Sequence, residues 1–208
     1  MGDSGKALGR PLGRPRQQGQ ESGRERLLRV ARQEFARKGY AATSVEELVT
    51  VAEVTSPTLY HHFGSKLGLF VATAKDVYDR TLTAFRSAVQ GTESFHDAVH
   101  ALIDQSAALM RDEPVLAMMI STMQFELRRD PELGTDLRPV LLEFRKFFDD
   151  LAERAPLELR PTPAATRDLS RLLVAVVAGI GSEGLLLPDS DDVTNMLEAL
   201  RRWIPPRT

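Results

Sequence analysis

Between residues 43 and 70 the apolar positions fall into three short blocks, each with the spacing of a helix. The first block recurs at i, i+3, i+4 and i+7 and consists of Val45, Leu48, Val49 and Ala52. In the second block, Leu59 and Phe63 are four residues apart and define one buried face. The third block lies in a helix that begins at Lys66. Two short helices joined by a tight turn and followed by a third predict a helix-turn-helix.

Small polar residues mark the ends of these helices. Thr43 followed by Glu46 predicts a capping box at the first helix. Thr55 is expected to cap the second helix, and Pro57 is tolerated in its first turn because a proline there loses no intrahelical bond. Gly64 is expected to end that helix.

The outward surface of the second helix is unusual for a face that meets only solvent. With Leu59 inward, a rotation of about 100° per residue turns the following side chains outward or to the flanks: Ser56, Pro57, Thr58, Tyr60, His61 and His62. Aromatic, imidazole and hydroxyl groups together suit a DNA groove. Ser65 can cap the third helix, so Lys66 would lie beside free backbone amides, a favourable place for a phosphate.

This run resembles the DNA-binding domain of the TetR family of bacterial transcription regulators. The resemblance spans about residues 22 to 72 and rests on Phe35 to Tyr40, Thr43-Ser44, Ala52-Glu53-Val54, Thr58-Leu59-Tyr60, His61-His62-Phe63 and Lys66. It implies phosphate contacts from Thr43, Tyr60, His62 and Lys66. One departure is Glu53, where the family has a turn glycine; a positive φ at this residue would cost on the order of 1 kcal/mol.

The resemblance and the helical periodicity together predict an all-α protein in three parts. Residues 1–21 would form a flexible basic arm, 22–66 the helix-turn-helix domain, and 67–208 a helical ligand-binding and dimerisation domain. In the last part, helices are expected over residues 93–111, 114–129, 132–153, 163–186 and 191–203, after a long helix from Lys66 to about Val89.

The arm repeats a short basic motif. Gly9-Arg10-Pro11 and Gly13-Arg14-Pro15-Arg16 resemble the Gly-Arg-Pro core of AT-hooks, which lie in A·T-rich minor grooves, where narrow grooves attract arginine. Ordinary basic tails have a similar composition. Two hypotheses therefore remain for the arm: contact with the DNA minor groove, or a basic tail without that role. The predicted DNA contacts are therefore Thr43, Thr55, Ser56, Pro57, Thr58, Tyr60, His61, His62 and Lys66, together with Arg10, Arg14 and Arg16 of the arm.

Charge is distributed unevenly along the 208 residues. Residues 1–66 hold 11 Lys and Arg against 7 Asp and Glu, a net +4, whereas the rest hold 16 against 22, a net −6. The basic end is the end with the motif, as DNA binding requires. Cysteine is absent, which excludes disulfides and cysteine-ligated zinc. The most apolar run, 172–187, has 16 residues, shorter than the ~18–20 of a membrane span. We expect a cytoplasmic protein with no membrane partner.

The middle helices contain a group of methionines, which fill irregular space and tolerate varied partners. The resemblance implies a small-molecule pocket here, and the expected lining is Met119, Met123, Leu141, Phe144 and Phe148. No cluster of charged residues interrupts these apolar stripes, so a largely apolar effector is expected. No cofactor is expected.

The last two predicted helices have wide apolar faces with small residues that allow close approach. In the TetR family the corresponding pair forms a four-helix bundle with the two-fold mate, and the alternative is packing within one chain. The expected dimer seam is Leu173, Val176, Val177, Ile180, Val193, Leu197 and Leu200. The resulting hypothesis is a ligand-responsive repressor, not an enzyme, that binds a palindromic operator as a homodimer and is released by its effector.

A metal-dependent protein is the alternative from another class. Glu93 and His96 form a Glu-x-x-His, and His96 and His100 are spaced i, i+4 on one helix face. A di-iron bundle needs two such motifs and two further glutamates. The remaining histidines, His61 and His62, have no glutamate three positions earlier. A metalloenzyme therefore lacks ligands, which leaves a single-metal regulatory site or an ordinary solvated face.

Overall fold

The computed structural model describes residues 21–129, 133–186 and 190–204, and every regular element in these ranges is helical. The helices are α1 (Gly23–Ala42), α2 (Val45–Val51), α3 (Ser56–Phe63), α4 (Lys66–Val89), α5 (Phe95–Asp112), α6 (Pro114–Arg129), α7 (Leu133–Ala152), α8 (Pro163–Leu186) and α9 (Ser190–Trp203). The predicted all-α fold is confirmed. The predicted bounds of the long helices hold to within a few residues, and those of α8 hold at both ends.

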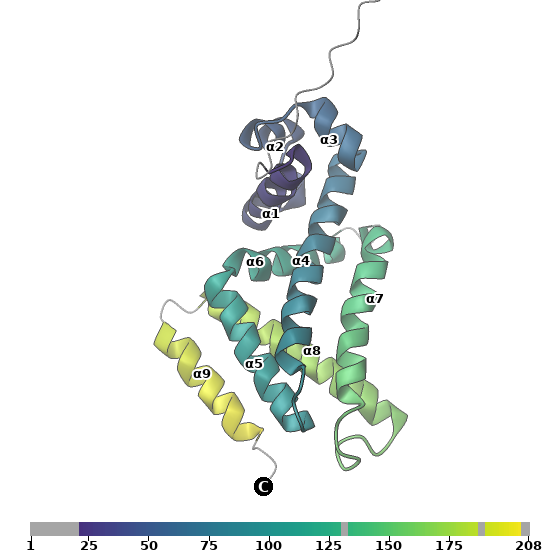
Figure 1. Ribbon diagram of the computed structural model, residues 1–208, viewed down its shortest axis with the longest axis vertical. Coiled ribbons are helices and arrows are strands. Elements are labelled where there is room, and N and C mark those ends of the chain that lie inside the picture. The colour runs from purple at the N-terminus through teal and green to yellow at the C-terminus, as the bar shows by residue number, and fades with distance from the viewer. Residues whose placement is uncertain (1–20, 130–132, 187–189, 205–208) are drawn as a thin grey trace, which may run out of the picture.

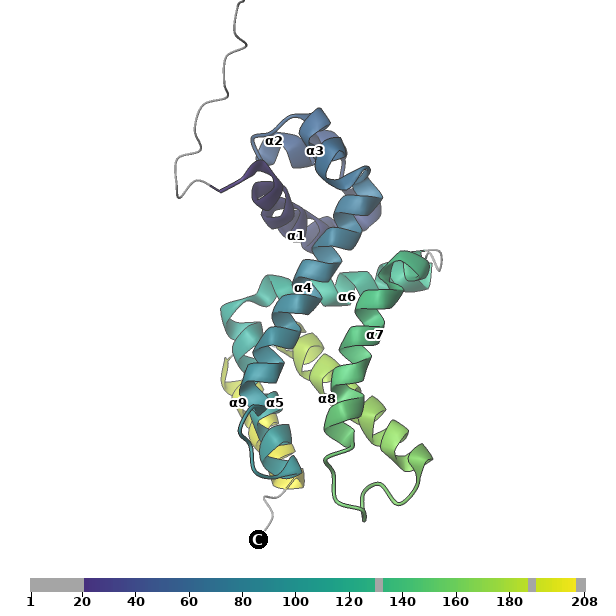
Figure 2. The ribbon, with the colours of Figure 1, turned by 45° about the vertical axis from the view of Figure 1, so that its right-hand side comes forward.

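The molecule is elongated, with α1, α2 and α3 grouped at one end (Figure 1). Helix α4 runs from this group into the body, and α6 crosses between the two parts (Figure 2). The body consists of the lower part of α4 with α5, α7 and α8, and α9 lies along α5 (Figure 1). We call α1–α3 the head, and we call the lower part of α4 together with α5–α9 the body.

Local chemistry explains where the head helices begin and end. The Ser22 side chain and Glu25 form a capping box at the start of α1. Gly39 has φ 79° and kinks α1 near its end, while Gly64 has φ 72° and ends α3. Both are conformations that a residue without Cβ adopts easily. Pro57 lies in the first turn of α3, as predicted.

Two clusters of buried side chains form the core. The upper cluster joins the head to α4 and α6, and in it the Phe35 and Phe70 ring centroids are 5.1 Å apart, edge to face. The lower cluster joins α4, α5, α7, α8 and α9. Phe70, Ala74 and Val77 of α4 are all fully buried in the upper cluster, together with α6 residues. Helix α4 therefore belongs to both the head and the body.

Candidate functional site

The outward face of α3 lies at the end of the head. Leu59 is fully buried and anchors the helix, whereas Pro57, Tyr60, His61 and His62 are exposed. The Tyr60 side chain is 51% exposed despite its size. Ser56 and Thr58 lie partly buried at the flank of this face. The eight-residue helix thus presents hydroxyl, imidazole and ring groups from one side, as the periodicity predicted.

The turn before α3 is held from α1. Glu53 has φ 51°, the left-handed conformation that the family pattern required of its glycine position. The Arg26 guanidinium donates hydrogen bonds to the backbone oxygens of Ala52, at 2.9 Å, and Glu53, at 3.2 Å. These two bonds fix the turn and offset the strain at Glu53.

Thr43 differs from its predicted role. Its side chain is 2% exposed, and its hydroxyl donates to the Gly39 backbone oxygen at 2.8 Å. The cap of α2 is instead Ser44, whose Oγ accepts from the Glu47 backbone amide at 3.1 Å. The predicted Thr43–Glu46 capping box is therefore wrong by one residue. Ser44 and Glu47 have the same spacing, and that pair was the signal that the sequence reading missed.

Thr55 occupies the N-cap position of α3, but its side chain makes no capping bond to the backbone. Its exposed hydroxyl instead lies 3.0 Å from that of Thr58, across the first turn. This hydroxyl pair lies beside the outward face of α3, so both groups border the predicted DNA-binding surface.

Lys66 was expected to meet a phosphate, but its ammonium already has partners within the protein. Nζ donates to the backbone oxygens of Tyr40, at 3.0 Å, and Thr43, at 2.9 Å, and lies 4.3 Å from the centre of the Tyr40 ring. The amides at the start of α4 are capped by Ser65, whose Oγ accepts from Gly68. In this structure Lys66 ties the end of α1 to the start of α4, because the α1 carbonyls there lack helical partners.

Most basic side chains of the described head are similarly engaged. Those in ion pairs with carboxylates are Arg29, Arg32, Arg37 and Lys38. Arg24 is exposed and lies over the Phe63 ring at 5.6 Å, with no carboxylate partner among the described residues. Residues 21–66 hold 7 basic and 6 acidic residues, a net +1, whereas residues 1–20 hold 4 and 1, a net +3. Three of the four net positive charges at this end therefore lie in residues 1–20, and Arg10, Arg14 and Arg16 lie outside the described residues.

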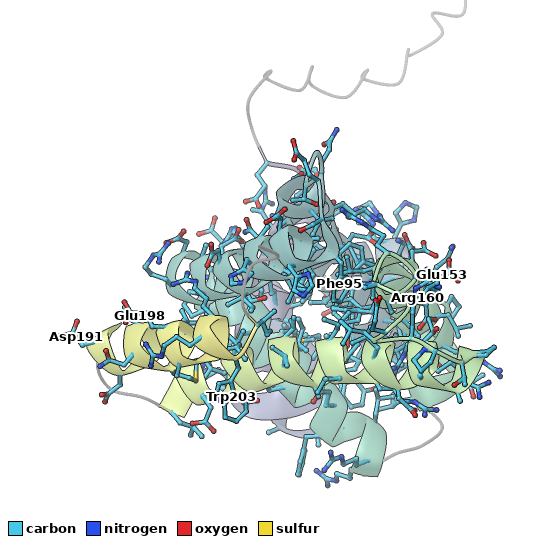
Figure 3. The ribbon with its side chains drawn as sticks, turned by 90° about the horizontal axis from the view of Figure 1, so that it is seen from below. Phe95, Glu153, Arg160, Asp191, Glu198 and Trp203 are labelled. Carbon is cyan, nitrogen blue, oxygen red and sulfur yellow. The ribbon has the colours of Figure 1, made fainter. Side chains whose placement is uncertain are left out.

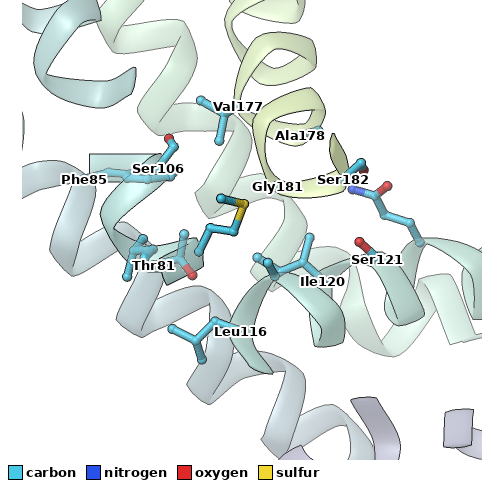
Figure 4. A pocket seen from close by; sticks show the side chains of 14 residues that line it. Thr81, Phe85, Ser106, Leu116, Ile120, Ser121, Val177, Ala178, Gly181 and Ser182 are labelled. Atoms are coloured by element: carbon cyan, nitrogen blue, oxygen red, sulfur yellow. The ribbon is translucent and has the colours of Figure 1, made fainter. Parts of the chain in front are cut away.

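A cavity of about 60 Å³ lies within the body between α4, α5, α6 and α8 (Figure 4). Its lining is apolar with a few hydroxyl and amide groups, and consists of Thr81, Phe85, Ser106, Leu109, Met110, Leu116, Ala117, Ile120, Ser121, Gln124, Val177, Ala178, Gly181 and Ser182. None of the five predicted lining residues belongs to it.

The five predicted residues lie in two other places. Met119, Met123 and Phe148 are fully buried core side chains. Leu141 and Phe144 line a separate hollow of about 380 Å³, together with the exposed Arg138 and Arg145. Helical periodicity identifies which side chains point inward, but an inward side chain can fill the core as well as border a cavity. The prediction could not separate these outcomes.

The predicted dimer seam is largely internal. Leu173, Ile180 and Leu197 are buried in the lower core cluster. Val176, Val177, Val193 and Leu200 are partly buried against it, and Val177 also lines the cavity. Seen from below, α8 and α9 lie in front of the other helices, and Trp203 projects from the end of α9 (Figure 3).

The exposed apolar residues of α8 and α9 form a different set. Leu172 is 58% exposed, Trp203 is 86% exposed, and Ala175 and Leu186 are also exposed. Leu172, Ala175 and Leu186 are spaced so that they share one side of α8. By length and composition, α8 is the one helix of the described chain that could cross a membrane, and 17% of its most apolar stretch is buried. Its 24 residues exceed the 16-residue run that the sequence indicated.

The proposed histidine pair is not arranged as a metal site. His100 Nε2 lies 2.6 Å from the backbone oxygen of Ile204, at the end of α9. His96 Nδ1 is buried without a hydrogen-bond partner, and Glu93 is exposed. Among the described residues, no three His, Cys, Asp or Glu side chains gather to hold a metal ion. His100 instead joins α5 to α9.

Comparisons with known proteins agree with this geometry. Residues 27–73 match the family described as bacterial regulatory proteins, tetR family. The HTH-type transcriptional regulator UidR of Escherichia coli (strain K12) is 25% identical over 167 residues, which cover 78% of this chain and 83% of UidR. Salmonella enterica GusR has a similar fold, with a TM-score of 0.66 and 23% identity over 88% of this chain and 95% of GusR. A transcriptional regulator from Saccharomonospora viridis, solved in complex with choline, has a TM-score of 0.65. It is 17% identical, over 87% of this chain and 94% of that regulator.

Proposed function

We propose that this chain, which belongs to the TetR family of bacterial regulatory proteins, represses transcription by binding an inverted-repeat operator as a homodimer and releases the operator when a small effector binds the body. The protein is a DNA-binding transcriptional regulator and not an enzyme. We place its action in the cytoplasm, where bacterial DNA is found.

The outward face of α3 is the observation that supports operator reading most directly. Leu59 fixes the rotation of the helix, so Pro57, Tyr60 and His61 face outward together. Ser56 and Thr58 at the flank add hydroxyl groups that bond to bases or phosphates. Arg24 and the arm residues Arg10, Arg14 and Arg16 would supply sequence-independent attraction to phosphates.

Dimerisation is supported by the exposed apolar side of α8. Large apolar groups such as Leu172 are unfavourable in water, and a second copy packed on a two-fold axis would bury both sets at once. We therefore assign the seam to Leu172, Ala175 and Leu186 of α8 with Trp203 of α9. The edge of this seam would be formed by Val176, Val193 and Leu200, which are partly buried against the lower core cluster.

Helix α6 offers a path from the cavity to the head. One side of it lines the cavity with Leu116, Ala117 and Ile120. Its other side contacts α1, where the buried Glu126 carboxylate accepts from the Tyr40 amide at 2.9 Å. An effector that displaced α6 would disturb this bond and the adjacent end of α1, and α4 would transmit the same displacement to the head.

A change in head spacing would be enough to release DNA. Operator half-sites lie roughly 34–36 Å or a multiple apart, so a small rotation prevents both heads from binding together. Linkage then requires that effector and operator weaken each other by the same factor, typically 1–3 kcal/mol.

Selection of bound duplexes from a random pool tests the operator-reading proposal. We expect an inverted-repeat consensus for the full-length chain and a changed base preference at one position of each half-site for Ser56→Ala. A pool without an inverted repeat would contradict the proposal.

A further inference from the structure

The cavity between α4, α5, α6 and α8 has no charged side chain in its lining. A charged group placed there would lose its hydration without gaining an opposite charge, which costs several kcal/mol. Phe85 is the single aromatic residue among the lining side chains, so the aromatic cage that suits a quaternary ammonium is lacking. The lining therefore favours an uncharged molecule.

Of the polar groups in the lining, the hydroxyls of Thr81 and Ser106 are buried, whereas Gln124 and Ser182 are exposed to solvent. Thr81 donates to the Val77 backbone oxygen at 2.9 Å, and Ser106 donates to the Leu102 backbone oxygen at 2.7 Å. A hydroxyl has one hydrogen and two lone pairs, so both groups can only accept from a ligand while these bonds persist. They lie on the same side of the cavity as Phe85, opposite Ser121 and Ser182 (Figure 4).

The size of the molecule that the cavity accepts depends on one flexible side chain, that of Met110. At about 60 Å³ the cavity is smaller than the roughly 150 Å³ that accommodates benzene in an engineered protein. Met110 reaches from α5 to α8, where a Cβ at Gly184 would lie 1.4 Å from its sulfur. Methionine changes rotamer easily, so movement of this thioether would enlarge the space.

We propose that this cavity binds an uncharged molecule with an apolar body of about one substituted ring and an O–H or N–H donor that Thr81 and Ser106 accept, with Met110 as the side chain that yields to it. The regulatory meaning of this ligand class rests on the proposed effector response.

Four one-ring probes separate the ligand classes: benzyl alcohol, toluene, benzoate and benzylammonium. Binding to the full-length protein is measured by calorimetry and by the NMR shift of the Met110 methyl group, assigned with Met110→Leu. We expect benzyl alcohol to bind about three- to tenfold more tightly than toluene, which is the range of one net hydrogen bond. Both ions should bind at least about tenfold more weakly than the alcohol.

Matched variants test the residues named. Thr81→Val should reduce the preference for the alcohol over toluene, and Thr81→Val combined with Ser106→Ala should abolish it, whereas Thr83→Val should retain it. Thr83 is on the same helix and makes the same bond to its own fourth preceding residue, but it is exposed and outside the cavity. Gly184→Ala displaces the Met110 thioether and should change the affinity for both neutral probes. Gly179→Ala, which meets nothing within 4 Å, should not.

Several results would overturn the ligand class: equal binding of an ion and the alcohol, a preference that survives the loss of both Thr81 and Ser106 hydroxyls, or no shift of the Met110 methyl with either neutral probe. Operator affinity is measured separately. Probes that bind as expected without weakening operator binding would contradict the effector response and leave the ligand class standing. An ion that releases the operator while the neutral probes fail to bind would contradict the ligand class and leave the effector response standing.

Discussion

Helices α3 and α8 both expose large side chains, but the chemistry of the two surfaces differs. The outward face of α3 carries the hydroxyl and imidazole groups of Tyr60, His61 and His62. The outward side of α8 carries hydrocarbon at Leu172, Ala175 and Leu186, interrupted by the exposed Glu183. A polar exposed face can remain hydrated until it meets a polar partner, whereas an apolar one gains free energy by being covered. The contrast supports DNA as the partner of α3 and a second copy as the partner of α8.

The two helices also differ in how they are anchored. Leu59 is the only buried side chain of α3, and the helix has eight residues, so its orientation depends on the turn that Arg26 holds. Helix α8 has 24 residues and is anchored along its length by Ser170, Leu173 and Ile180. Changes on the outward side of α8 should therefore alter assembly without unfolding the chain, whereas changes near α3 can alter both reading and local stability.

The largest expected effect comes from a charge on the outward side of α8. Leu172→Asp would place two unpaired carboxylates in a two-fold apolar seam, a cost of about 3 kcal/mol or more and so an increase of about 100-fold in the dimer dissociation constant. Sedimentation measures the dimer, and operator binding should weaken with it. Leu157→Asp is the control, since Leu157 is also exposed but lies in the connection before α8. A Leu172→Asp chain that remains dimeric would place the seam elsewhere.

An intermediate effect is expected on the outward face of α3. Tyr60→Ala removes one contact from each head, and because a lost base or phosphate contact costs about 1–3 kcal/mol, operator affinity should fall at least about tenfold. The dimer should be unchanged. Tyr60→Phe separates the hydroxyl from the ring in the same titration. If Tyr60→Ala binds operator as the unchanged chain does, α3 does not read DNA through this face.

The smallest expected effect on DNA binding concerns Lys66, where a structural role and a phosphate contact can be distinguished. Lys66→Met removes the ammonium that donates to the Tyr40 and Thr43 backbone oxygens, which should cost about 1–3 kcal/mol of stability. For a chain of this size, that loss lowers the Tm by roughly 2–12 °C. The dependence of operator binding on salt should hardly change. A salt slope that falls by about one, with unchanged Tm, would instead show the phosphate contact that the sequence indicated.

Local features were predictable because they depend on neighbouring residues. The buried positions Leu48, Val49 and Leu59 follow from helical spacing. The end of α3 at Gly64 follows from backbone freedom at glycine. The capping prediction at α2 failed because Thr43 and Ser44 both have a glutamate three residues later, and burial of Thr43 against Gly39 decides between them.

Sequence alone determined the helices, their amphipathic faces, the outward set on α3 and the resemblance to the TetR family, since each depends on order and spacing along one chain. Only the tertiary structure decided what the inward faces meet. Met119 and Met123 pack in the upper core cluster with the head, whereas Ile120, the residue after Met119, borders the cavity. Leu173 enters the core while Leu172 remains exposed. The reason is that helical periodicity separates inside from outside, whereas a void or a seam arises from the fit of several helices whose residues are distant in sequence.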